Sequence, residues 1–98
     1  MSSAPPVASP ALVAKVERAF FVEGRLRAMP AKRSKRLVVL DRLAQAFEPG
    51  RSYPEPAVNE VLTAYHPDYA MLRRYLVDEG FLAREFGYYW RTGGSVPL

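Results

Sequence analysis

DYAMLRRYLVDEGFLAREFGYYWR, residues 68–91, is the stretch that decides the fold. Asp68 is placed to cap a helix by accepting from the amides of the first turn, and Gly80 is placed to end it. The residues after Gly80 predict two short strands, 81–84 and 88–91, with Gly87 supplying the tight turn between them. A helix that runs directly into a basic, aromatic hairpin is typical of the end of a winged-helix domain.

The preceding residues predict further helices and little strand. Ser9 and Pro10 suit a helix start, with serine as the cap and proline in the first turn. A turn at Glu23-Gly24 precedes alternating residues that predict a half-buried strand at 25–29, and Ser34 is a candidate cap for the helix that follows. Apolar residues recur at one-face helical spacing in three segments, which we expect to be helices: 10–19, 35–47 and 55–65. Residues 51–53 are expected to be extended.

These elements predict one α+β domain that is mostly α. We expect a winged-helix-like domain with three core helices, a C-terminal β-hairpin wing and an extra N-terminal helix. A length of 98 residues suits a single domain with tails. The expected boundaries are a flexible N-terminal tail at 1–9, the domain at 10–92 and a flexible C-terminal tail at 93–98.

Composition excludes several classes of function. The chain has no cysteine and only one histidine, His66, so disulfides, thiolate metal sites and multi-histidine metal sites are excluded. No apolar run reaches membrane length and no secretory signal is visible, so we expect a cytoplasmic protein with no membrane partner. No nucleophile, paired carboxylate or phosphate-binding glycine loop forms a recognisable catalytic pattern. We therefore expect neither an enzyme nor a cofactor, metal or small-molecule substrate.

Positive charge favours a polyanionic partner. The formal net charge is +4, and the densest run of cations lies at residues 32–36. Basic residues at a helix N-terminus oppose the helix dipole, which a bound anion can compensate. A solvated basic linker is an equally good interpretation, and the sequence leaves both open.

The two adjacent arginines of the 68–79 helix are expected to have different roles. Arg73 falls on its apolar side, so we expect a structural ion pair with a carboxylate of the preceding helix, Glu60 or else Glu55. Arg74 falls on the exposed side and is the better candidate for phosphate contact. Asp78 and Glu79 share that exposed surface, which argues against ordinary readout of a major groove by this helix.

The hairpin supplies the remaining candidates. Its cations are interleaved with aromatic residues that can stack on bases. One inward face must pack on the helices, formed either by Tyr88 and Trp90 or by Tyr89 and Phe86. The candidate nucleic-acid contacts are Lys32, Arg33, Lys35, Arg36, Arg74, Arg84 and Arg91.

The segment from about Phe20 to Arg91 resembles the bacterial domain of unknown function 2087 family. The residues that carry the resemblance are GRLRAMPAKRSKRLVVLDRLAQAFEPGRSY at 24–53, VNEVL at 58–62, DYAMLRRYLVDEGFLARE at 68–85 and YYWR at 88–91. Members occur alone or behind a helix-turn-helix domain in proteins described as transcriptional regulators. The resemblance implies a role in gene regulation.

Two hypotheses about function follow. The first is a regulatory protein that binds nucleic acid, DNA before RNA, through phosphate contacts by the basic cluster and the wing. The alternative is a protein-interaction or dimerisation module without direct nucleic-acid binding. In that case the amphipathic N-terminal helix would be the arm of a homodimer.

Overall fold

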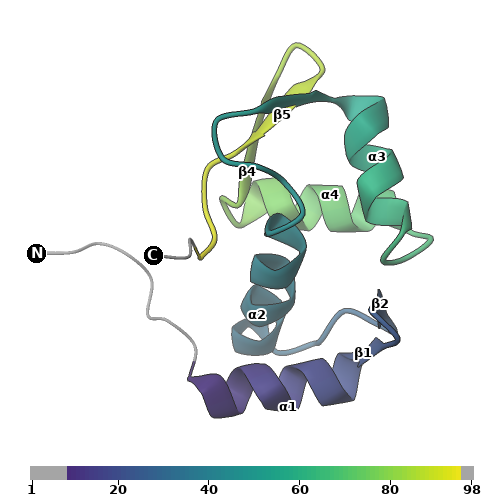
Figure 1. Cartoon of the computed structure of the whole chain (residues 1–98), viewed down its shortest axis with the longest axis vertical. Coiled ribbons are helices and arrows are strands. Elements are labelled where there is room, and N and C mark those ends of the chain that lie inside the picture. The colour runs from purple at the N-terminus through teal and green to yellow at the C-terminus, as the bar shows by residue number, and fades with distance from the viewer. Residues whose placement is uncertain (1–8, 96–98) are drawn as a thin grey trace, which may run out of the picture.

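The computed structural model describes residues 9–95, which form four helices and two small antiparallel sheets (Figure 1). The α+β, mostly helical class expected from the sequence is therefore confirmed. The elements, in chain order, are α1 (Pro10–Phe20), β1 (Phe21–Val22), β2 (Arg25–Leu26), α2 (Arg33–Ala44), β3 (Ser52–Pro54), α3 (Glu55–Thr63), α4 (Tyr69–Asp78), β4 (Leu82–Glu85) and β5 (Tyr88–Arg91).

Two helix starts follow the capping chemistry that the sequence predicts. The Ser9 hydroxyl accepts a hydrogen bond from the amide of Leu12 at 3.1 Å, and Asp68 Oδ1 accepts one from Met71 at 3.1 Å. The start of α2 was predicted wrongly, because the helix begins at Arg33 with Lys32 as its N-cap and no side-chain cap. Ser34 therefore lies inside the first turn. The basic run is thus part of the helix and not a linker before it.

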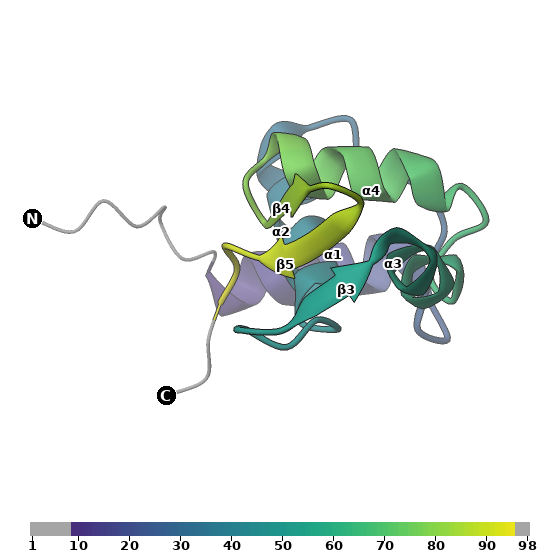
Figure 2. The ribbon, with the colours of Figure 1, turned by 90° about the horizontal axis from the view of Figure 1, so that it is seen from above.

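The larger sheet joins segments that are far apart in the sequence. Its strand order is β3-β5-β4, so β3 pairs with β5 across Tyr53 and Tyr89, and β5 pairs with β4. In Figure 2 the three strands lie side by side, with α4 along one flank and α3 near the end of β3. The sequence predicted an extended segment at 51–53 but not its pairing, because the partner strand is more than thirty residues away.

The smaller sheet was predicted only in part. The turn at Glu23-Gly24 is confirmed, with φ values of 51° and 79°. The expected strand at 25–29 is limited to β2, whose partner β1 directly follows α1. After β2 the Arg27 amide donates to the Phe20 carbonyl at 2.7 Å, and no strand pairing continues to residue 29.

One hydrophobic core lies between the helices and the inner face of the larger sheet. The rings of Phe47 and Tyr53 pack edge to face, with their centres 5.2 Å apart. Tyr89 of β5 is also in the core, with its side chain 1% exposed. Fully buried residues come from α2, α3, α4 and both strands of the hairpin: Val39, Leu40, Leu43, Val58, Leu62, Leu72, Leu76, Leu82 and Tyr89. The inward face of the hairpin is therefore the one that contains Tyr89. The prediction that Phe86 shares this face is wrong, because Phe86 lies in the turn and its side chain is exposed.

Residues 93–95, which the sequence assigned to a C-terminal tail, make contacts with the helices and the hairpin. A tail was expected from residue 93, but the Ser95 amide donates to Asp41 Oδ1 at 2.6 Å, and the Ser95 hydroxyl donates to Asp41 Oδ2 at 2.8 Å. Gly93 lies so close to the backbone that an added Cβ would be 2.7 Å from the Gly80 carbonyl oxygen. Residues 93–95 thus pack on the domain. The tail predictions for 1–8 and 96–98 lie outside the described residues.

Candidate nucleic-acid interface

The exposed side of α4 is the centre of the candidate site. Leu72 and Leu76 are fully buried, so the helix is fixed by its inner side. Arg74 and Asp78 are exposed on the other side, next to the half-buried Tyr75. This side of α4 is therefore open to solvent.

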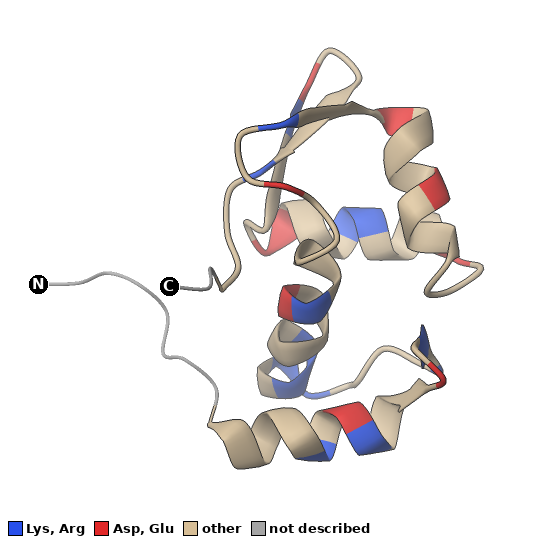
Figure 3. Ribbon diagram, viewed as in Figure 1, with Lys and Arg blue, Asp and Glu red and all other residues tan. Residues whose placement is uncertain are grey.

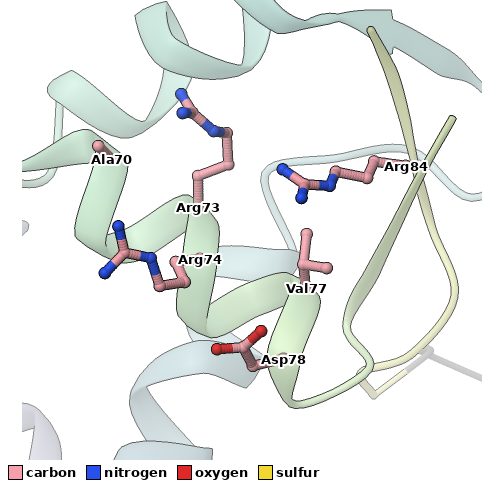
Figure 4. Close-up of a pocket in the computed structure, with 6 residues that line it drawn as sticks. All are labelled: Ala70, Arg73, Arg74, Val77, Asp78 and Arg84. Atoms are coloured by element: carbon pink, nitrogen blue, oxygen red, sulfur yellow. The ribbon is translucent and has the colours of Figure 1, made fainter. Parts of the chain in front are cut away.

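A pocket separates α4 from the hairpin. Its volume is about 260 Å³, and it is lined by Ala70, Arg73, Arg74, Val77, Asp78 and Arg84. In Figure 4, Arg84 extends from β4 toward α4, Arg73 rises from α4 and turns away from Arg84, and Arg74 extends from the side of α4 away from the hairpin. Arg74 and Arg84, two contacts that the sequence predicted from separate elements, therefore both line this pocket but extend to different sides of α4.

Arg73 is held in place by α3. Its guanidinium donates to Asn59 Oδ1, and its Nε lies 4.0 Å from Glu55 Oε1, which also accepts from the Tyr89 hydroxyl at 2.8 Å. Of the two carboxylates that the sequence predicted as the partner, Glu55 is the one that lies beside Arg73. Glu60, named first, is wrong, because it is exposed and forms no ion pair within residues 9–95. Glu55 and Asn59 are four residues apart and share one face of α3, whereas Glu60 points elsewhere. Arg73 therefore lines the pocket while its guanidinium is held by these two side chains of α3.

Arg84 remains at the surface with its charge intact. The hydrogen bond to the Tyr89 phenol, followed by the nearby charges of Glu55 and Asp78, raises the pKa of the Arg84 guanidinium above its ordinary value. Arg84 and Tyr89 are opposite each other in the β4–β5 register, so both lie on the face of the hairpin that looks toward α4. The positively charged Arg84 guanidinium therefore lies on the hairpin side of the pocket.

The basic cluster at residues 32–36 lies against the C-terminal half of α4. Arg33 forms two hydrogen bonds to the Glu79 carboxylate, at 2.7 and 3.1 Å, and the Arg36 guanidinium lies 5.6 Å from the centre of the Tyr75 ring. Arg36 also donates to the Ala31 carbonyl. The lysines of the cluster, Lys32 and Lys35, make no side-chain hydrogen bond or ion pair within the part of the chain that is described. Cations therefore stand on both flanks of the exposed side of α4.

The Arg33–Glu79 pair also sets a pH dependence. The hydrogen bond from Arg33, with the charges of Arg33 and Arg36, holds the pKa of the Glu79 carboxyl below its ordinary value of 4.5, although partial burial opposes the shift. A carboxylate with a lowered pKa stabilises the fold above its unfolded pKa. That contribution is lost as the pH falls through the lower folded value. The pair is solvent-exposed on the Arg33 side, so its contribution to stability is small.

Arg91 lies at the base of the hairpin and faces the C-terminal segment. Its guanidinium donates to the carbonyls of Phe47 at 3.2 Å, Gly93 at 2.9 Å and Ser95. The guanidinium of Arg91, a residue predicted from the sequence to contact nucleic acid, is thus bonded to three backbone carbonyls. Phe86 was not among the contacts predicted from the sequence. It lies at the tip of the same hairpin and its side chain is 96% exposed.

The charged residues around α4 are mixed in sign. Figure 3 shows Lys and Arg on α4, at the start of α2 and on the hairpin, with Asp and Glu at the C-terminal end of α4. Within residues 9–95 there is no group of three or more His, Cys, Asp or Glu arranged to hold a metal ion. No helix among these residues is long and apolar enough to cross a membrane.

Fold and site together define a small α+β domain with a cation-flanked surface helix. The chain belongs to DUF2087, a family described as an uncharacterized protein conserved in bacteria, whose match covers residues 25–91. No curated protein and no solved structure matches the chain. The family therefore supports the bacterial assignment made from the sequence.

Proposed function

We propose that this protein is a winged-helix-like regulatory protein that binds nucleic acid, DNA before RNA, in the bacterial cytoplasm. Support comes from the order of elements: α2, β3, α3, α4 and the hairpin β4–β5, with a three-stranded sheet in the order β3-β5-β4. This order is typical of winged-helix domains. In such a domain α3 and α4 form the helix-turn-helix unit, and α4 is the helix that faces DNA.

The observation that carries the proposal is the position of cations on both flanks of α4. Arg84 reaches α4 from the hairpin, Arg74 extends from the exposed side of α4, and the basic cluster of α2 contacts α4 through Glu79 and Tyr75. Three separate elements thus supply positive charge along one surface. Cations on separate elements around one helix suit contact with the phosphate backbones that border a DNA groove.

The proposed contacts are a subset of those expected from the sequence. Lys32, Lys35, Arg74 and Arg84 are the phosphate contacts, and Arg33 joins them when it exchanges Glu79 for a phosphate. Arg36 and Arg91 are omitted because their guanidinium groups are already bonded to backbone carbonyls. Asp78 and Glu79 repel phosphates and, in the major groove, can accept only from the amino groups of cytosine and adenine, so binding is expected to depend on the backbone more than on sequence.

The experiment that tests this proposal is a titration of a fluorescently labelled, mixed-sequence DNA duplex across a salt series, followed by anisotropy. Release of counterions from three or more neutralised phosphates predicts a slope of log K against log salt of about −3 or steeper. An affinity that does not change between low and moderate salt would overturn the phosphate-contact mechanism. Absence of binding by folded protein at low salt would overturn nucleic-acid binding itself.

The alternative, a homodimer or protein-interaction module, remains the second proposal. The apolar side of α1, which would be the dimer arm, packs within the same chain: Val16 is 1% exposed, and Glu17 pairs with Arg42 of α2. Val13 is the large apolar residue that α1 leaves exposed, at 37%. The surface that α1 offers to a second copy is therefore smaller than its sequence pattern suggests.

A further inference from the structure

The tip of the hairpin carries an aromatic residue where its backbone favours a small polar one. β4 and β5 are joined by the two-residue loop Phe86-Gly87, with φ values of 51° and 80°, between the paired residues Glu85 and Tyr88. A loop with two positive φ values strongly favours Asn-Gly, because asparagine tolerates the left-handed conformation and a bulky side chain does not. Phe86 is therefore a poor choice for the turn itself.

Packing does not explain Phe86 either. Its side chain is 96% exposed, compared with 49% for Tyr88, 51% for Val22 and 38% for Tyr69. It makes no contribution to the hydrophobic core, which uses Tyr89 from the same hairpin. An asparagine at position 86 would suit both the turn and the solvent better. Neither the turn nor the core of residues 9–95 therefore accounts for the phenylalanine.

We infer that Phe86 is a wedge that stacks against a base step of duplex DNA when the exposed side of α4 lies on the duplex, an inference that rests on the proposed function. Figure 1 shows the turn between β4 and β5 at one extreme of the molecule, beyond the helices. The turn is held in place, because β3 pairs with β5 as far as Tyr88 and the Gly87 carbonyl accepts from the Glu55 amide at 2.9 Å. Phe86 is thus an exposed aromatic side chain on a fixed, projecting turn. Apolar wedges of this kind enter between base steps and kink the duplex.

The surroundings of Phe86 favour a base over a protein partner. A protein interface needs a broad, contiguous surface, and the other exposed aromatic of this hairpin is Tyr88 alone. The hairpin also has a cationic side and an acidic side, because Arg84 faces α4 and Glu85 faces the opposite way. The cationic side is continuous with the pocket that contains Arg74. Phosphates along that side would bring the tip to the bases.

The test compares Phe86→Asn with Phe86→Trp, and uses Val22→Thr as the control that removes an exposed apolar residue elsewhere. All are titrated onto a duplex that contains 2-aminopurine, whose fluorescence rises when it is unstacked. Phe86→Asn is expected to keep or raise the melting temperature, lose about tenfold in affinity and leave the salt slope unchanged, because the phosphate contacts remain. Wild type, Phe86→Trp and Val22→Thr should unstack the probe, and Phe86→Asn should not.

The outcomes separate this inference from the proposed function. Salt-dependent binding by wild type together with equal binding by Phe86→Asn would overturn the wedge and leave DNA binding standing. The same holds if wild type binds but leaves the probe stacked. A wild type that binds no duplex would overturn both. A loss of affinity in Phe86→Asn with a lower melting temperature than wild type would assign Phe86 to the fold and overturn the wedge.

Discussion

A variant that replaces Lys32, Arg74 and Arg84 with glutamine will lose DNA affinity by about 10²-fold at moderate salt, since three phosphate contacts disappear. The three residues are exposed and come from the start of α2, from α4 and from β4. Arg33, Arg36 and Arg91 are left unchanged. Each is bonded within the protein, so replacing it could destabilise the fold and lower the affinity for that reason alone. The salt slope should decrease in magnitude by about 3, or roughly one for each contact removed.

The control is a variant with the same net charge in which Lys15, Arg18 and Arg27 are replaced by glutamine. These residues are also exposed but lie on α1 and after β2, away from α4. Anisotropy titrations across the salt series compare the two variants with wild type. A control that loses as much affinity as the first variant would mean that only total charge matters, and the defined surface around α4 would be wrong.

Arg91→Lys is expected to lower the free energy of unfolding by about 1–3 kcal/mol, because charge-assisted hydrogen bonds to part-buried carbonyls are lost. The Arg91 fork reaches three carbonyls, on Phe47, Gly93 and Ser95, and so joins the end of α2 to the C-terminal segment. A lysine ammonium keeps the charge but cannot reproduce this fork. Urea denaturation followed by the fluorescence of Trp90 measures the change.

Arg91→Gln serves as the companion variant because it removes the charge as well. If Arg91 acts in the fold, both variants lose similar stability and, under conditions where both are folded, bind DNA as wild type does. If Arg91 is instead a phosphate contact, Arg91→Lys stays stable and binds normally while Arg91→Gln loses affinity. That second pattern would restore the role that the sequence suggested for this residue.

Local features of the fold could be predicted from the sequence, and distant pairings could not. The caps of Ser9 and Asp68 and the turn at Gly87 depend on residues a few positions away, so their chemistry is visible in the sequence. The pairing of β3 with β5 depends on a three-residue segment meeting a distant strand. Such a short segment carries too little periodicity to specify a partner.

At the candidate site, the exposure of a side chain could be predicted from the sequence, but its bonding partners could not. Arg74 could be placed on the outer side of its helix from helical periodicity, and the structure bears that placement out. The partners of Arg33, Arg36 and Arg91 could not be predicted, because each is bonded across a tertiary contact or to a carbonyl of an irregular segment. The outward position of Phe86 could not be predicted either, because it is set by the geometry of the turn and not by the alternation of side chains along the strand.

The proposed DNA-binding surface can be tested directly by titrating ¹⁵N-labelled protein with a short mixed-sequence duplex and following the backbone amide shifts. We predict that the shifts concentrate in three segments: the start of α2 at 32–36, α4 at 69–78 and the hairpin tip at 84–88. Amides of α1 and of β1–β2 should change little. Shifts confined to α1 and β1–β2, or no shifts at low salt, would contradict binding through the cation-flanked side of α4.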